Sequence, residues 1–197
     1  MKIYILRHEE RTIDASFFSP LTKNGLKNSI NLIPIIEKLN ITTIISSPFI
    51  RTLQTILPYS KYRNIKINLE YGLCEILHSN IIPPKSYNVE LPDYLCEEFN
   101  YNPEYNSLIK STELEYPEDE KMFENRTKKI LKFIIQKYYK TNENILLVTH
   151  QGHCKNILQI INKNVSIKPE TESMDNYSTG KISLIFDQNK WKYAKLN

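Results

Sequence analysis

Two arginines and two histidines stand at places in the sequence where their side chains could form one anion-binding site. Arg7-His8 and His150 each follow a short apolar run, and Arg51 comes shortly after Ser46-Ser47-Pro48. Arginine offers a planar fork of N–H donors to phosphate oxygens and stays charged, whereas an imidazole can be neutral and nucleophilic near pH 7. Together these residue types predict a phosphoryl-binding site in which a histidine attacks phosphorus.

The elements that would position these side chains alternate between strands and helices. Residues 1–6, 43–46 and 144–149 form short apolar runs rich in β-branched residues, which predicts buried strands. In an α/β sheet the ligand site lies beyond the carboxyl ends of the parallel strands. We therefore expect an α/β fold, a three-layer sandwich with a mostly parallel central sheet and helices on both faces, that gathers the four side chains at one sheet edge.

A helix is expected from Thr22, its N-cap, to about Leu39, with a kink at Pro34. Its predicted buried face contains Leu26, Ile30, Ile33 and Ile36. A second helix is expected to begin with Pro48 at its first position, so that Arg51 falls in its first turn. The remaining predicted elements are a strand near 65–69, helices at about 118–139 and 152–162, and a hairpin formed by residues 180–186 and 190–196.

The whole chain, residues 1–197, is expected to form one domain with an insertion, or lid, at about 78–117. Helical and strand periodicity is lost there, and residues 86–120 hold ten Asp or Glu and one Lys, a charge of −9 that leaves +13 on the rest. A basic body indicates an anionic ligand. Nucleic acid is one candidate, but no helix-turn-helix, zinc-finger or RNP-like pattern accompanies the charge, so we expect no nucleic-acid partner.

Composition argues against several other classes of protein. With only 4 glycines, the chain contains neither the G-x-G-x-x-G nor the G-x-x-x-x-G-K-[ST] phosphate loop. The 3 cysteines show no C-x-x-C spacing and none is followed six positions later by Arg, which excludes a zinc ribbon and the cysteine-phosphatase loop. No apolar stretch approaches the ~18 residues of a membrane span. We expect a soluble, cytoplasmic protein with no cofactor and no membrane partner.

The sequence resembles the histidine phosphatase (phosphoglycerate mutase-like) superfamily over nearly its whole length. The motifs that carry the resemblance are, in chain order, Leu6-Arg7-His8, Leu21-Thr22-Lys23-Asn24-Gly25, Ser46-Ser47-Pro48-Phe49-Ile50-Arg51-Thr52-Leu53-Gln54-Thr55, Gly72-Leu73-Cys74-Glu75 and Val148-Thr149-His150. The run from Arg7 to Arg11 is most similar to phosphatase members with R-H-G-E-R, among them the phosphotyrosine-directed Sts-like branch.

The resemblance implies a role for each residue of the cluster. The implied catalytic residues are His8, Glu75 and His150, and the implied phosphate-binding residues are Arg7, Arg11, Arg51 and His150. His8 would become phosphohistidine, and Glu75 would protonate the leaving oxygen and later activate water. Arg11 would be an additional phosphate or substrate contact, unless it pairs with Glu9 or Glu10. The expected reaction is hydrolysis of a phosphomonoester, either a small molecule or a phosphopeptide.

Two positions depart from the family pattern, because Glu9 stands where glycine is usual and Gln151 follows the distal histidine. A Glu9 carboxylate facing the site about 5 Å from a phosphate charge would cost about 3 kcal/mol at an effective dielectric near 20. A side chain turned outward would cost almost nothing. We expect an active enzyme.

Other functions for the same residues are less favoured. A phosphoglycerate mutase would share the nucleophile, but the acidic insertion is a poor lining for a triply anionic phosphoglycerate. An inactive phosphate-binding or assembly module is disfavoured because all four core side chains are present. A metal cluster of His150, His153 and Cys154 lacks the H-E-x-x-H spacing and a nearby carboxylate. We expect His153 to flank the site, His78 to lie at the mouth of the insertion and Cys74 to be a buried thiol.

Overall fold

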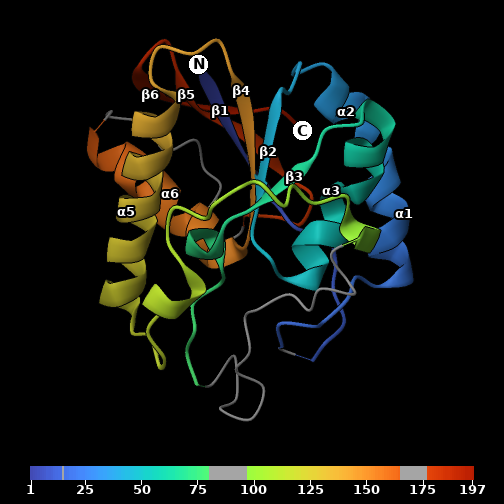
Figure 1. Cartoon of the computed structure of the whole chain (residues 1–197), viewed down its shortest axis with the longest axis horizontal. Coiled ribbons are helices and arrows are strands. Elements are labelled where there is room, and N and C mark those ends of the chain that lie inside the picture. The colour runs from blue at the N-terminus through green and yellow to red at the C-terminus, as the bar shows by residue number, and fades with distance from the viewer. Residues whose placement is uncertain (15, 80–96, 165–176) are drawn as a thin grey trace.

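A six-stranded sheet forms the middle layer of the molecule (Figure 1). The computed structural model describes residues 1–14, 16–79, 97–164 and 177–197. The strands are β1 (Lys2–Arg7), β2 (Thr43–Ser46), β3 (Ile67–Leu69), β4 (Asn144–Thr149), β5 (Ile182–Asp187) and β6 (Lys190–Lys195), arranged in the order β3-β2-β4-β1-β5-β6. The first four strands in this order are parallel, and β5 and β6 add an antiparallel hairpin. The predicted mostly parallel sheet is confirmed.

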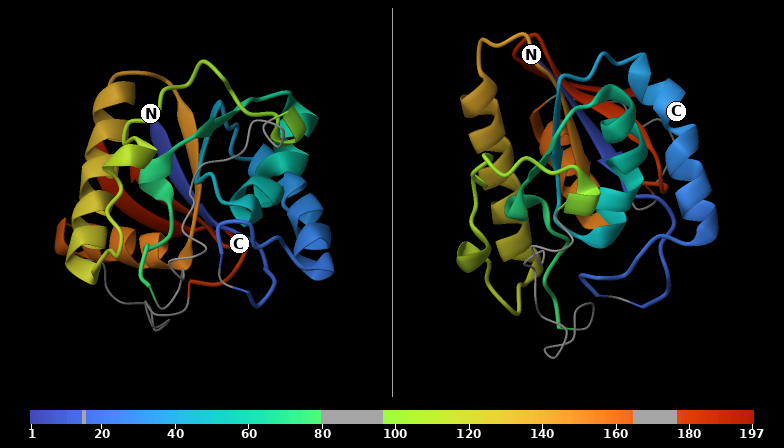
Figure 2. Two further views of the ribbon diagram at one scale, coloured as in Figure 1. Left: turned by 60° about the horizontal axis from the view of Figure 1, so that its bottom comes forward. Right: turned by 45° about the vertical axis from the view of Figure 1, so that its right-hand side comes forward.

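Helices cover both faces of the sheet. One layer contains α1 (Lys23–Asn31), α2 (Ile33–Glu37) and α3 (Ile50–Arg63), and the opposite layer contains α5 (Glu120–Tyr138) and α6 (Gln151–Asn164). Both views in Figure 2 keep these two groups on opposite sides of the strands. The short 3-10 helices are η1 (Tyr71–Leu73), η3 (Glu97–Phe99) and η4 (Ser111–Glu113). In the described part of the chain, no helix has the length and apolarity needed to span a membrane.

The register of the parallel strands brings their carboxyl ends to one edge of the sheet. Arg7 pairs with Thr149 across β1 and β4, and Ser46 pairs with Val148 across β2 and β4. His8 and His150, the residues that follow β1 and β4, therefore leave the sheet at the same level, and Ser47, which follows β2, lies one register position earlier.

The predicted helix from Thr22 to Leu39 consists of two helices. Thr22 is the N-cap of α1, because its hydroxyl accepts from the Gly25 amide at 3.0 Å. The chain then turns at Leu32, and α2 carries Pro34 in its first turn. Proline removes a helical hydrogen bond and clashes with the preceding turn, so the predicted kink at this residue is a break between helices.

The predicted buried face of this first helix was wrong for Leu26 and Ile30, although Ile36 is buried and Ile33 packs against the core. Leu26 is 43% exposed and Ile30 is 58% exposed, whereas Gly25 and Ser29 face the interior. A Cβ added at Gly25 would overlap the carbonyl oxygen of Glu10. The helix therefore lies so close to the backbone after β1 that only small side chains fit between them, and this close approach overrides the apolar spacing.

The predicted start of the second helix was also wrong. Helix α3 begins at Ile50 with Phe49 as its N-cap, not at Pro48. Phe49 keeps an extended backbone that buries its ring against Phe17, with ring centroids 4.9 Å apart. The helix starts after this aromatic contact, and Arg51 still falls in its first turn.

Residues 97–117, the described part of the predicted insertion, pack against the end of β3. The buried carboxylate of Glu70 accepts hydrogen bonds from the Tyr105 hydroxyl at 3.0 Å, the Ser107 hydroxyl at 2.8 Å, and the amides of Leu108 and Ile109 at 2.7 and 3.1 Å. Glu70 therefore attaches this segment to the sheet. Residues 80–96 of the predicted insertion lie outside the described residues.

Candidate active site

His8 follows β1 and is buried, with 4% of its surface exposed. Its Nδ1 lies 2.6 Å from the Glu9 carbonyl oxygen, a contact that places a proton on Nδ1 and leaves the lone pair on Nε2. Burial, and next the charge of Arg51, lower the pKa of His8 to about 3. The imidazole is therefore neutral at physiological pH, which is the form that a nucleophile requires.

Arg7 and Arg51 are each held by a carbonyl oxygen from a different loop. The Nη1 of Arg7 donates to the Tyr177 carbonyl at 2.5 Å, and the Nη1 of Arg51 donates to the Ser16 carbonyl at 2.9 Å. The Arg51 guanidinium also lies 4.5 Å from the centre of the Phe49 ring. Burial lowers the pKa of Arg51 to about 10, so the side chain keeps its charge near neutral pH.

His150 follows β4, and its ring faces His8 edge-on with 5.3 Å between the ring centroids. Its Nε2 lies 2.8 Å from the Ser47 hydroxyl oxygen. Burial, and next the charge of Arg51, lower the pKa of His150 well below its usual range. A neutral ring that accepts from the Ser47 hydroxyl at Nε2 carries its proton on Nδ1.

Three buried nitrogen atoms of this cluster have no hydrogen-bond partner among the described residues. They are Arg7 Nε, Arg51 Nε and His150 Nδ1, and they account for three of the four such side-chain atoms in that part of the chain. A buried polar atom without a partner costs about 1–3 kcal/mol, so it is rare unless a ligand satisfies it. The geometry therefore suits a small anion with several acceptor oxygens.

Glu75 approaches the same cluster from the segment that follows β3 and η1. Its Oε1 accepts from the Ile76 amide at 3.1 Å, and a Cβ added at Gly152 would lie 2.5 Å from that oxygen. The Glu75 carboxylate thus lies against the first turn of α6, where a side chain would displace it. Burial lowers the pKa of Arg7 and of Arg51, and the negative charge of Glu75 raises both. The carboxylate therefore lies near both arginines.

The carboxylate of Glu9 lies against α1 and the turn before β5. Its Oε2 accepts from the Asn28 amide at 3.5 Å, and its other oxygen occupies the volume that a side chain at Gly180 would fill. Gly180 has a φ of +67°, a backbone conformation that favours glycine. Burial raises the pKa of Glu9.

Arg11 holds its own loop. Its Nη1 donates to the carbonyl oxygens of Thr12, Ile13 and Asp14 at 2.6, 3.2 and 2.9 Å. Its charge contributes to the low pKa of His8, after burial and the charges of Arg51 and Arg7. A direct contact of Arg11 with a ligand stays a prediction.

His153 belongs to α6 and faces α5, and its ring is fully buried. Its Nδ1 is 3.1 Å from the Thr127 hydroxyl oxygen and its Nε2 is 3.2 Å from Arg126 Nη1. The sequence interpretation missed Arg126 and its partner Glu118, although a charged residue one turn from Phe123 on an apolar helix face could have indicated a buried ion pair. Within the described ranges, no three His, Cys, Asp or Glu side chains group as metal ligands.

The three-layer fold and the side chains at its sheet edge define a protein that hydrolyses or transfers phosphoryl groups. The family description of the histidine phosphatase superfamily (branch 1) matches residues 3–197, and the chain belongs to this family. No protein with a curated description matches the sequence.

Several solved structures share the fold at low sequence identity. The ecdysone phosphate phosphatase of Bombyx mori, solved with tungstate, is 15% identical with a TM-score of 0.75 over 98% of this chain and 91% of that chain. A phosphoglycerate mutase of Bacillus anthracis is 17% identical with a TM-score of 0.70 over 99% and 92%. The alpha-ribazole phosphatase of Shigella flexneri is 19% identical with a TM-score of 0.64 over 100% and 96%. These similarities confirm the phosphoglycerate mutase-like fold.

Proposed function

We propose that this protein hydrolyses phosphomonoesters through a phosphohistidine intermediate on His8. The observation that carries the proposal is a set of buried nitrogens, from Arg7, Arg51 and His150, that have no partner in the described part of the chain and lie near a neutral imidazole. A phosphoryl group has three non-bridging oxygens that can accept from these atoms. The phosphorylated ring would keep its proton on Nδ1 and continue to donate it to the Glu9 carbonyl oxygen, because the attacking atom is Nε2.

In the first half of the reaction, the Nε2 lone pair of His8 attacks phosphorus. The bond between phosphorus and the ester oxygen breaks, and the Glu75 carboxyl group gives its proton to that oxygen, so the alcohol leaves neutral. Arg7, Arg51 and His150 stabilise the charge that builds on the non-bridging oxygens. The products are the free alcohol and phosphohistidine.

In the second half, a water molecule attacks the phosphohistidine. The Glu75 carboxylate accepts a proton from this water, the P–N bond breaks, and inorganic phosphate leaves while the lone pair returns to His8 Nε2. A mutase would instead transfer the phosphoryl group to a second hydroxyl of the substrate. Hydrolysis is supported by the phosphatases among the solved structures that share the fold, although a phosphoglycerate mutase shares it as well.

The test is turnover of p-nitrophenyl phosphate together with rapid acid-free denaturation to trap phosphohistidine. We expect the wild type to release p-nitrophenol and to carry an acid-labile adduct, and His8→Ala to do neither. His78→Ala is the matched control, because it removes a histidine that the proposed steps do not use, and it should retain the adduct. A wild type with no turnover and no adduct would refute the proposal.

A second measurement separates hydrolysis from transfer. With 3-phosphoglycerate as substrate, a mutase moves the phosphoryl group to the 2 position faster than it releases phosphate, whereas the proposed phosphatase releases phosphate without that transfer. Tungstate, a tetrahedral oxyanion, should also raise the melting temperature of the wild type, since it binds the folded state alone. Arg51→Gln should remove most of this increase.

A further inference from the structure

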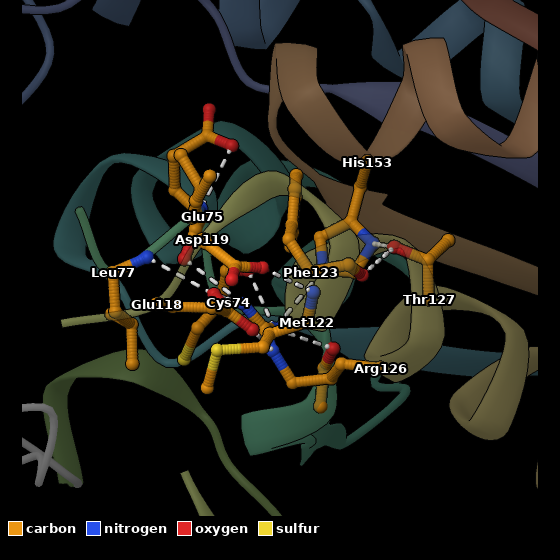
Figure 3. Close-up of polar contacts among 12 residues, drawn as sticks. Cys74, Glu75, Leu77, Glu118, Asp119, Met122, Phe123, Arg126, Thr127 and His153 are labelled. Carbon is orange, nitrogen blue, oxygen red and sulfur yellow. Dashed lines mark hydrogen bonds and ion pairs between the residues drawn. The ribbon is translucent and has the colours of Figure 1, made fainter. Parts of the chain in front are cut away.

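A buried ion pair between Arg126 and Glu118 lies next to the segment that carries Glu75 (Figure 3). The pair is bidentate, because Arg126 Nε donates to one Glu118 oxygen at 2.8 Å and Nη2 donates to the other at 2.7 Å. Both side chains are at least nine-tenths buried. Neither residue is required by the proposed reaction steps.

The remaining donors of Arg126 all reach the backbone just before and at Glu75. Nη1 donates to the carbonyl oxygens of Gly72 and Cys74 at 2.9 Å each, and Nη2 donates to the carbonyl of Glu75 itself at 3.2 Å. The planar guanidinium therefore fixes the positions of three carbonyl groups relative to one another. A lysine has no planar fork and only three donors, so it cannot bind these three carbonyl groups and both Glu118 oxygens at once.

Glu118 holds the same segment on the other side of Glu75. Its carboxylate accepts from the Leu77 amide at 3.1 Å, and its own amide donates to the Leu77 carbonyl at 3.0 Å. Together, Glu118 and Arg126 bind the backbone from Gly72 to Leu77, with Glu75 between their points of attachment.

The Arg126 guanidinium also contacts a side chain of α6. His153, three residues after His150, contacts Arg126 Nη1 at 3.2 Å and the Thr127 hydroxyl at 3.1 Å. Burial, and next the charge of Arg126, lower the pKa of His153 well below its usual range, so this ring is neutral and adds no second positive charge. The helix that follows the distal histidine is thereby connected to the segment that carries the carboxylate.

We propose that Arg126 and Glu118 are positioning residues that hold the Glu75 carboxylate where it can protonate the leaving group. The inference rests on the proposed function of Glu75 as the general acid. The Glu75 side chain has a hydrogen bond from the neighbouring Ile76 amide, so the backbone around it determines where the carboxylate lies. A buried ion pair is weak evidence of stabilisation alone, because its desolvation offsets its attraction.

The test compares kcat/KM for two substrates that differ in their need for a general acid. The phenolate leaving group of p-nitrophenyl phosphate departs without a proton, whereas the alkoxide of an alkyl phosphate requires one. General acid catalysis contributes about 10²–10⁴-fold, so we expect Arg126→Lys and Glu118→Gln to lose about 10-fold or more on the alkyl ester and less than about threefold on the phenyl ester. Using kcat/KM confines the comparison to steps up to leaving-group departure.

Matched controls come from an exposed ion pair and from the core. Arg63→Lys and Glu37→Gln make the same substitutions in the surface pair Arg63–Glu37, and they should leave both substrates unaffected. Ile134→Ala removes buried side-chain volume from α5 and lowers stability, but it removes none of the hydrogen bonds that Arg126 and Glu118 make to residues 72–77. It should not produce a loss that depends on the leaving group.

In the Glu75→Gln background the Arg126 and Glu118 substitutions should have little further effect on the alkyl ester, because they act through the carboxyl group already removed. Equal losses on both substrates, or additive losses in this background, would overturn the inference while leaving the phosphatase proposal intact. A wild type inactive on both esters would overturn the two proposals together. If Arg126→Lys does not fold, Glu118→Gln still allows the comparison of kcat/KM on the two esters, because glutamine has nearly the same shape as glutamate.

Discussion

Three buried histidines should lower the free energy of unfolding in mild acid. Burial is the main cause that lowers the pKa of His8 to about 3 and that of His150 and His153 well below their usual range. In the unfolded chain each imidazole titrates near pH 6.5. Below that pH the unfolded chain binds more protons than the folded one, so stability is lost as the pH falls through about 6.5.

The expected loss follows from the proton balance. For a histidine that stays neutral in the folded state, acidification from pH 6.5 to 5.5 lowers the free energy of unfolding by about 1 kcal/mol, so three such residues lower it by about 3 kcal/mol. Glu9 acts in the opposite direction, because burial raises its pKa and the folded state takes up that proton more readily than the unfolded chain. The net loss is therefore smaller than the sum for the three histidines.

Urea unfolding at a series of pH values between 5.5 and 7.5 measures this slope. We expect a slope that approaches the uptake of three protons on unfolding, and the substitution His153→Gln, His150→Asn or His8→Asn should each reduce it by about one proton. A free energy of unfolding that is flat across this range would show that the rings take up protons in the folded state. It would refute the assignment of His8 as a neutral nucleophile.

The other predictions concern close contacts of glycine and one helix cap. Gly25→Ala should destabilise the protein by about 1–3 kcal/mol, because its Cβ would overlap the Glu10 carbonyl, and chemical denaturation that shows no loss would contradict the close packing of α1. Thr22→Ala should cost about 1 kcal/mol by removing the cap of α1, measured in the same way. Gly152→Ala should lower kcat/KM by roughly 10–100-fold, because its Cβ would displace the Glu75 carboxylate; an unchanged value for an alkyl phosphate would contradict that placement.

The parallel strands were the most predictable part of the fold. Residues 144–149 form β4 with the predicted bounds, because a strand buried on both faces is a continuous apolar run with no competing helical pattern. The edge of the sheet at which His8 and His150 meet followed from the same feature, since parallel strands end at one level.

Packing between elements was not predictable in the same way. The buried face of α1 is chosen by the approach of Gly25 to the Glu10 backbone, which no local apolar pattern encodes. The sequence gives no sign of which groups Arg126 binds, and only the tertiary structure shows that the carbonyl oxygens of Gly72, Cys74 and Glu75 accept from the guanidinium. Tertiary hydrogen bonds of this kind leave little trace in local periodicity.

Glu9 and Gly180 share one volume in the folded protein, and this limits the order in which substitutions can accumulate during evolution. A side chain at position 180 would require the Glu9 carboxylate to move, in addition to the strain of a φ of +67°. The carboxylate at position 9 is therefore favoured where position 180 is glycine. The two sites should therefore covary among relatives, and Gly180→Ala should be tolerated better in a Glu9→Gly background than alone. Glu9, which departs from the family pattern, thus depends on Gly180, a residue far away in the sequence that leaves room for its carboxylate.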